Sequence, residues 1–174
     1  MHSIDIFIQN YFSLIRTAQL TELMYLLTTL FDFSFPFILI ILAVALLIFL
    51  IRSIRHTLLF VSAISFGAGV VYILKYIFNI ARPLDAVLTL PNPSFPSGHA
   101  ALTAIFFIII MYIFDQYFES LGRVIFNSFC VSMIVLVSFS RIYLGVHWLS
   151  DVLFGLVLGS LVSYFSVLVF KKIL

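Results

Sequence analysis

Hydrophobic residues fill long stretches of this chain, and charged residues fall in the gaps between them. Five stretches contain no Asp, Glu, Lys or Arg: residues 33–51, 57–74, 100–114, 124–139 and 152–170. About 20 helical residues cross the hydrocarbon layer of a bilayer, and a shorter apolar stretch suffices when its flanking residues reach the interface. The pattern therefore predicts an all-α, polytopic membrane bundle with five transmembrane helices.

Residues 1–31 follow a different pattern. Asp5, Arg16 and Glu22 interrupt them, while apolar residues recur at helical spacing from Leu20 to Phe31. This spacing is typical of amphipathic helices that lie on the membrane or dip into it. We predict one or two such N-terminal helices, with a sixth span through residues 8–30 as the alternative. No linker or repeat divides the chain, so 1–174 is predicted to be a single domain with its transmembrane core at 33–171.

Composition supports the membrane assignment. Of the 174 residues, 64% are hydrophobic and only 9% are charged, and the mean hydropathy is +1.26. Water-soluble domains of this length do not normally reach such values. No run or stripe of basic residues is present, so nucleic acid is not an expected partner. The single cysteine, Cys130, lies in an apolar stretch and is interpreted as a small buried residue.

The remaining basic residues predict the orientation. Those outside the polar clusters described below fall mostly on one side of the five spans: Arg52, Arg55, Arg123, Lys171 and Lys172. By the positive-inside rule this side faces the cytoplasm. We expect a multi-pass protein of the cell membrane, plasma or inner, whose loops 79–96 and 142–149 face the extracytoplasmic side.

Three polar clusters border those two loops. They occupy residues 75–83, 96–99 and 140–151 and contain Lys75, Arg82, Ser97, Gly98, His99, Arg141, His147 and Asp151. Ionisable groups near membrane depth are costly and are functional by default. Since two spans separate the second cluster from the third, all three clusters meet on one face and form one site.

The cations of this site predict an anion-binding pocket. Lys75, Arg82 and Arg141 would converge there, and the planar fork of arginine suits phosphate oxygens. Ser97 is predicted to cap the third span, whose free backbone N–H groups favour an anion. Gly98 would let the backbone approach that anion closely.

Two histidines add reactive groups to the pocket. His147 and Asp151 are four residues apart, so on a helix the carboxylate can hold the imidazole in one tautomer, as a nucleophile or base requires. His99 is then left as a general acid. Metal binding by these three residues and Asp85 is the competing idea, and the nearby cations disfavour it.

These motifs resemble those of a known family. The chain contains three patterns in order: Lys-x6-Arg-Pro, Pro-Ser-Gly-His and Ser-Arg-x5-His-x3-Asp. They resemble the complete set of three signature motifs of the type 2 phosphatidic acid phosphatase (PAP2) superfamily. The helices from about residue 33 also resemble the fold of that superfamily. The resemblance implies that His147, oriented by Asp151, attacks phosphorus and forms a phosphohistidine, while His99 protonates the leaving group. It also implies that no metal or cofactor is needed and that the phosphate is held by Lys75, Arg82, Ser97, Gly98 and Arg141.

A pocket at headgroup level suits a lipid phosphate as the substrate. Phosphatidate, phosphatidylglycerophosphate, undecaprenyl diphosphate and lipid A 1-phosphate all fit, and family members act on each. Some undecaprenyl-diphosphatases of the family carry aspartate where this chain has Gly98, which slightly favours a general lipid phosphatase. A lipid phosphotransferase using the same phosphohistidine is one alternative. A non-enzymatic anion-binding membrane protein is another, although it would be expected to have lost His99, His147 or Asp151.

Overall fold

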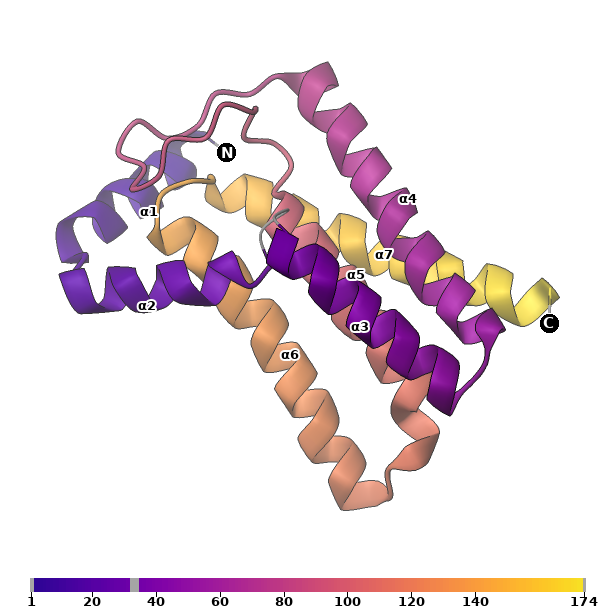
Figure 1. Cartoon of the computed structure of the whole chain (residues 1–174). Helices are drawn as coiled ribbons and strands as arrows, with labels where there is room; N and C mark the ends of the chain where they lie inside the picture. The colour runs from indigo at the N-terminus through magenta and orange to yellow at the C-terminus, as the bar shows by residue number, and fades with distance from the viewer. Residues whose placement is uncertain (1, 32–34, 174) are drawn as a thin grey trace.

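The computed structural model describes residues 2–31 and 35–173, and within them every regular element is a helix (Figure 1). In chain order the elements are α1 (His2–Ile15), α2 (Ala18–Thr29), α3 (Phe35–Ile51), α4 (Ile54–Phe78), α5 (Gly98–Phe114), the 3₁₀ helix η1 (Asp115–Tyr117), α6 (Ser120–Tyr143) and α7 (Leu149–Ile173). The predicted all-α fold is therefore confirmed.

Four segments in the described part of the chain are long and apolar enough to cross a membrane: α4, α5 continued by η1, α6 and α7. The protein is therefore a polytopic membrane protein, as predicted. Helix α3 has 17 residues, or about 25 Å at the α-helical rise, which is slightly less than the hydrocarbon thickness. The first predicted span begins at Phe33, which lies outside the described residues, and a fifth crossing at α3 stays a prediction.

Two separate helices form the N-terminal segment. Helix α1 ends at Ile15, and Thr17 caps α2 by accepting a hydrogen bond from the backbone N–H of Leu20. A sixth span through residues 8–30 would need one continuous helix, whereas the structure has two short helices here, and one or two were predicted. Figure 1 shows α1 and α2 beside the end of α6 that leads into α7.

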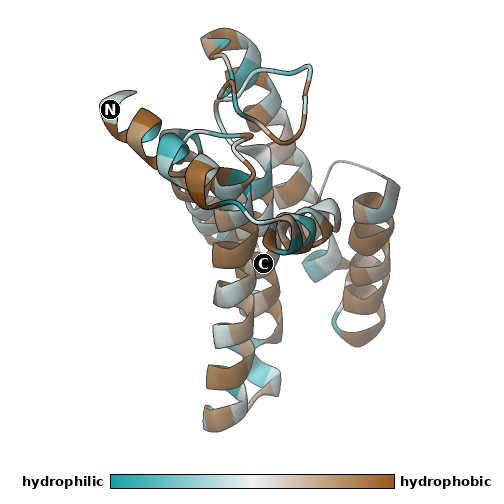
Figure 2. Cartoon of the chain, turned by 90° about the vertical axis from the view of Figure 1, so that its left-hand side faces the viewer, coloured by the Kyte–Doolittle hydropathy of each residue, from teal (hydrophilic) through white to brown (hydrophobic). Residues whose placement is uncertain are grey.

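Helix α5 is the centre of the bundle and is buried along most of its length. Helix α7 approaches it closely through Gly155 and Gly159, because a Cβ at either glycine would collide with backbone oxygens of Ser97 or Ala101. Small residues four apart are the usual means by which membrane helices pack this closely. Figure 2 shows hydrophobic residues along the long helices, and many of their large apolar side chains are exposed, where a bilayer would cover them.

Four helix ends position the polar clusters. Helix α4 ends at Phe78 and is capped by Asn79, which has a left-handed backbone (φ 44°) and donates its N–H to the carbonyl of Lys75. Ser97 caps the start of α5, and residues 144–148 join α6 to α7. The carboxyl ends of α4 and α6 therefore meet the amino ends of α5 and α7 at one end of the bundle.

Candidate active site

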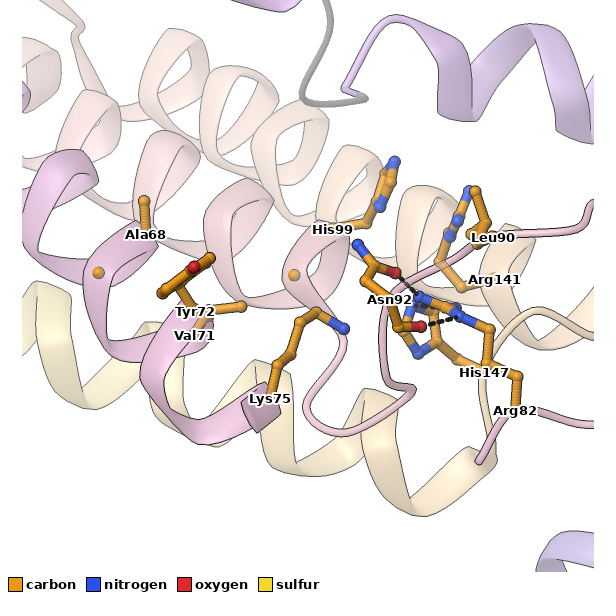
Figure 3. Close-up of a pocket in the computed structure, with 12 residues that line it drawn as sticks. Ala68, Val71, Tyr72, Lys75, Arg82, Leu90, Asn92, His99, Arg141 and His147 are labelled. Atoms are coloured by element: carbon orange, nitrogen blue, oxygen red, sulfur yellow. Dashed lines mark hydrogen bonds between the residues drawn. The ribbon is translucent and has the colours of Figure 1, made fainter. Parts of the chain in front are cut away.

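One cavity of about 470 Å³ brings the three clusters together at this end of the bundle (Figure 3). Six of the eight predicted site residues line it: Lys75, Arg82, Gly98, His99, Arg141 and His147. The other two, Ser97 and Asp151, are buried next to this lining. The expectation that the clusters meet on one face is therefore confirmed.

The remaining lining is mostly apolar. Helix α4 contributes most of this apolar lining, through Ala68, Gly69, Val71 and Tyr72. Figure 3 labels three of these residues, Ala68, Val71 and Tyr72, and shows them on α4, away from the histidines and arginines. A Cβ added at Gly69 would meet no atom within 4 Å, so the wall is open at this position. The cavity thus has a cationic end and an apolar wall.

Arg82 joins the two loops that frame the cationic end. Its Nε donates to the carbonyl of Asn92 (2.9 Å), its Nη2 donates to the side-chain oxygen of the same residue (2.5 Å), and its Nη1 donates to the carbonyl of Val146 (2.5 Å). Hydrogen bonds from a charged donor are stronger than neutral ones. Arg82 therefore fixes the loop before α5 against the loop that carries His147.

Lys75 reaches the same region from the last turn of α4. Its ammonium group donates to the carbonyls of Pro93 (2.6 Å) and Ser94 (3.2 Å), and the residue is only 8% exposed. A buried ammonium must find acceptors to offset its lost hydration. Lys75 therefore holds the loop before α5 in place and also brings a positive charge to the cavity wall.

His147 and Asp151 form the expected pair, with Ser94 between them. Nδ1 of His147 lies 3.5 Å from Oδ2 of Asp151, which is long for a hydrogen bond. The hydroxyl of Ser94 lies 3.4 Å from Nδ1 and donates to Oδ2, which also accepts the backbone N–H of Trp148 at 2.9 Å. The carboxylate is thus fixed by two donors and faces the imidazole directly and through the serine.

The contacts of His147 indicate its tautomer. Nη1 of Arg82 lies 3.3 Å from Nε2, and because a guanidinium can only donate, Nε2 must accept. The proton of the neutral ring then lies on Nδ1, which faces Ser94 and Asp151. Nε2 then carries the lone pair that a nucleophile requires, and in this structure that lone pair accepts from Arg82.

Electrostatics keep this ring neutral. Burial lowers the pKa of the His147 imidazole well below its usual value, and the positive charges of Arg141 and Arg82 lower it further. The protonated form, which has no lone pair at Nε2, is therefore disfavoured at neutral pH.

The start of α5 supplies His99 and a capped helix terminus. His99 lies in the first turn and lines the cavity, as does the backbone of Gly98. The hydroxyl of Ser97 accepts a hydrogen bond from the N–H of Ala100 at 3.4 Å. The backbone N–H of Ser97 donates to the carbonyl of Asp151 at 3.1 Å. Ser97 thus caps the helix as predicted, whereas direct phosphate binding by this residue stays a prediction.

Sequence reasoning missed several residues that hold the site together. Ser94 and Asn92 lie in the loop before α5, outside the three motifs. Thr28 accepts a hydrogen bond from Nη1 of Arg141 at 2.7 Å, and it comes from the N-terminal segment. No sequence signal distinguishes these residues, because their contacts depend on how the chain folds.

Metal ligation is the competing use of these side chains. Within residues 2–31 and 35–173, no group of three or more His, Cys, Asp or Glu side chains is arranged to hold a metal ion. The side chains that face the cavity's polar end are instead cations and imidazoles, which suit an anion.

A family model of the PAP2 superfamily matches residues 56–174, which is more than half of the chain and includes every residue that lines the cavity. The chain belongs to the PAP2 superfamily. It is therefore a phosphatase of the PAP2 type, a hydrolase, and a multi-pass membrane protein.

Individual PAP2 proteins are similar over most of the chain. An undecaprenyl-diphosphatase from Sulfolobus acidocaldarius is 34% identical over 166 residues, which cover 90% of this chain and 75% of that protein. The crystal structure of a PAP2-type phosphatidylglycerolphosphate phosphatase from Bacillus subtilis matches with a TM-score of 0.91 at 30% identity, over 99% of this chain and 87% of the other. The crystal structure of Aquifex aeolicus LpxE matches with a TM-score of 0.75 over 95% of this chain and 93% of the other. Its identity to this chain is only 22%, so this match supports the fold alone.

Proposed function

We propose that this PAP2 protein hydrolyses the phosphomonoester or diphosphate of a membrane lipid through a phosphohistidine on His147. One observation carries the proposal: a single cavity joins three cations and two histidines to an apolar wall formed by α4. An amphiphile whose phosphate lies at the cationic end and whose tail follows α4 would satisfy both parts. Neither part alone would distinguish a lipid phosphate from a soluble one.

In the first step, Nε2 of His147 attacks phosphorus as the bond from phosphorus to the lipid oxygen, or to the bridging oxygen of a diphosphate, breaks. His99 gives a proton to the departing oxygen, and Asp151 stabilises the positive charge that develops on the imidazole. The equatorial oxygens of the phosphoryl group are stabilised by the cations Lys75, Arg82 and Arg141. The backbone N–H of Gly98 and Ser97 at the helix start stabilise the same oxygens.

In the second step, water attacks the phosphohistidine and inorganic phosphate leaves. His99, now without its proton, takes one from the attacking water. His147 returns to its neutral tautomer with the proton on Nδ1. The arginines and the lysine supply the charge neutralisation that metal ions provide in other phosphoryl-transfer enzymes, so no metal ion is required.

Substrate candidates follow from the relatives. Undecaprenyl diphosphate is supported by the Sulfolobus protein, and phosphatidylglycerophosphate by the Bacillus structure. Phosphatidate and lipid A 1-phosphate share the same chemistry at the reacting phosphorus. Comparing kcat/KM for phosphate release from all four lipids identifies the natural class.

The purified protein tests the mechanism. We expect phosphate release without any added acceptor, unchanged by EDTA and abolished in His147→Ala. Brief reaction with a radiolabelled lipid phosphate, followed by an alkaline quench, is expected to leave label on His147 that mild acid removes. Activity that is lost in EDTA and restored by magnesium, or full turnover by His147→Ala, would contradict the proposal.

The active site is proposed to face the extracytoplasmic side of the cell membrane. Arg52 and Lys171 line a second cavity, at the opposite end of the bundle, as the positive-inside rule requires. Single cysteines at fully exposed Leu84 and at Arg123 test this in intact cells, since native Cys130 is buried. An impermeant thiol reagent should label position 84, whereas labelling at position 123 alone would reverse the orientation.

A further inference from the structure

Helices α1 and α2 bury several polar side chains against the bundle and expose large apolar ones. Their polar residues Asp5, Gln9 and Thr28 are at most 7% exposed, while Phe7 and Leu14 are 67% and 84% exposed. These exposed apolar side chains point away from the protein, as they would toward lipid, and the buried polar ones pack on the bundle beside apolar residues such as Met24. Buried polar side chains need partners, so the contacts of these polar residues indicate what the two helices hold.

The first contact is with a cation of the active site. Oγ1 of Thr28 accepts a hydrogen bond of 2.7 Å from Nη1 of Arg141, and the two residues are each 2% exposed. The hydroxyl therefore orients a guanidinium that lines the cavity.

The second contact is with the loop that carries His147. Arg16 donates from Nε to the carbonyl of Tyr143 (2.8 Å), the last residue of α6, and from Nη1 to the carbonyl of Asp85 (2.7 Å). Carbonyls at a helix end lack partners in their own helix, and the guanidinium supplies one here. A Cβ at Gly145 would collide with Nη2 of Arg16, so this side chain lies against the backbone two residues before His147.

The third contact is at the start of α7. Asp5 accepts the backbone N–H of Ser150 at 2.9 Å and its hydroxyl at 2.8 Å. A carboxylate at a helix amino end stabilises that end. Asp5 thus fixes the residue immediately before Asp151.

We propose that α1 and α2 act as a positioning element for catalysis, in which Thr28 orients Arg141 while Arg16 and Asp5 fix the two ends of the loop that carries His147. The inference rests on the proposed function of these catalytic groups. None of the three positioning residues lines the cavity, so each acts through a residue that does. Misplacing reacting groups by about 1 Å can lower a rate by about 100-fold, which gives such contacts a large effect on turnover.

A matched pair of variants at Thr28 tests the first contact. Thr28→Val keeps the shape and removes the hydroxyl, and we expect the kcat of the folded variant to fall by about tenfold. Thr28→Ser restores the acceptor and is expected to restore kcat to within about twofold. Wild-type kcat in Thr28→Val, or an equal loss in Thr28→Ser, would overturn the role of this hydroxyl.

Arg16→Gln tests the second contact with a readout that does not need activity. Amide hydrogen exchange across residues 143–150 should become faster, while exchange within α5 stays unchanged. Gln19→Ala, on the exposed face of α2, is the control and should alter neither segment. Unchanged exchange at residues 143–150 in Arg16→Gln would overturn the proposal. This outcome does not depend on Thr28→Val, so it decides the proposal even if that variant fails to fold.

The two proposals fail in different ways. Wild-type protein that releases no phosphate from any lipid of the panel would remove the proposed function, and the exchange experiment would still decide whether the N-terminal helices hold the loop. Active wild-type protein with normal kcat in Thr28→Val and normal exchange in Arg16→Gln would remove only the positioning element.

Discussion

The hydroxyl of Ser94 donates a hydrogen bond to the carboxylate of Asp151. The same oxygen lies 3.4 Å from Nδ1 of His147, and the direct distance from this nitrogen to the carboxylate is 3.5 Å. The serine therefore helps the carboxylate to hold the ring, although it belongs to none of the three motifs. The imidazole of His147, the proposed nucleophile, is oriented by two groups rather than one.

We expect Ser94→Ala to lower kcat for lipid phosphate hydrolysis by about tenfold, because the imidazole would lose one of the contacts on its Nδ1 side. KM should change little, since the cations that are proposed to bind phosphate remain. Steady-state kinetics on the purified variant measure both quantities.

Ser62→Ala is the matched control for this substitution. Its hydroxyl bonds the carbonyl of Leu59 within α4, at 3.2 Å, and does not line the cavity. We expect wild-type kinetics from this control. Equal activity in Ser94→Ala and Ser62→Ala would show that Asp151 orients His147 without the serine.

Asp151→Asn should be far more damaging, with kcat reduced by about 10³- to 10⁴-fold, the range known for such changes in catalytic triads. An amide can present its NH₂ group to Nδ1 of His147, which favours the wrong tautomer, and it cannot stabilise the charged ring. Single-turnover measurements should show slow formation of the phosphoenzyme. A loss below tenfold would mean that the carboxylate serves mainly to hold the loop.

The pH dependence should reflect the lowered pKa of His147. The ring must be neutral to attack, so this requirement is met above its pKa and activity is lost as the pH falls through it. Because burial and nearby cations lower that pKa, the acid limb of kcat/KM should lie below about 6.5, the ordinary histidine value. An acid limb at or above that pH would contradict the electrostatic argument.

Removing one cation should move this limb. Arg141→Gln deletes a positive charge that lowers the pKa of His147, so the acid limb of its residual activity should shift to higher pH. Arg123→Gln removes the same charge far from the site, where it pairs with Asp115 at 3.2 Å, and should leave the limb in place. Using one substrate throughout cancels the titration of the substrate itself.

The positions of the site residues could be predicted from the sequence because they depend on helix parity. Uncharged stretches gave the helices, and two spans between His99 and Arg141 place both on one face. The short N-terminal helices were also predictable from the spacing of their apolar residues. Their polar contacts with the bundle were not, because a hydrophobic pattern identifies an apolar face without saying what the polar residues bond.

The supporting contacts could not be predicted for a different reason. Arg16 bonds the carbonyl of Tyr143, and Thr28 bonds Arg141, across 127 and 113 residues of chain. Such contacts depend on tertiary packing, to which neither local spacing nor motif matching is sensitive. Ser94 lies close to the second motif, but its role needs the fold that brings α7 beside it.

Close packing of α7 on α5 gives a prediction about stability. Substituting Gly159 by Ala would place a Cβ in collision with the carbonyl of Ala101 and 2.9 Å from the Cβ of Ala104. Backbone atoms cannot move aside cheaply, so we expect the free energy of unfolding to fall by about 1–3 kcal/mol. Thermal unfolding in detergent, followed by circular dichroism, measures the loss.

Gly69→Ala is the matched control, because a Cβ there meets no atom within 4 Å. Alanine is the better helix former by about 1 kcal/mol, so this variant should be as stable as the wild type or slightly more stable. A glycine-to-alanine substitution should therefore lower the stability at position 159 in α7 and leave it unchanged or raise it at position 69 in α4, if the contact between α5 and α7 stabilises the fold. A Gly159→Ala protein that melts at the wild-type temperature would mean that α7 can move outward without cost, and the contact would not then fix Asp151 relative to His99.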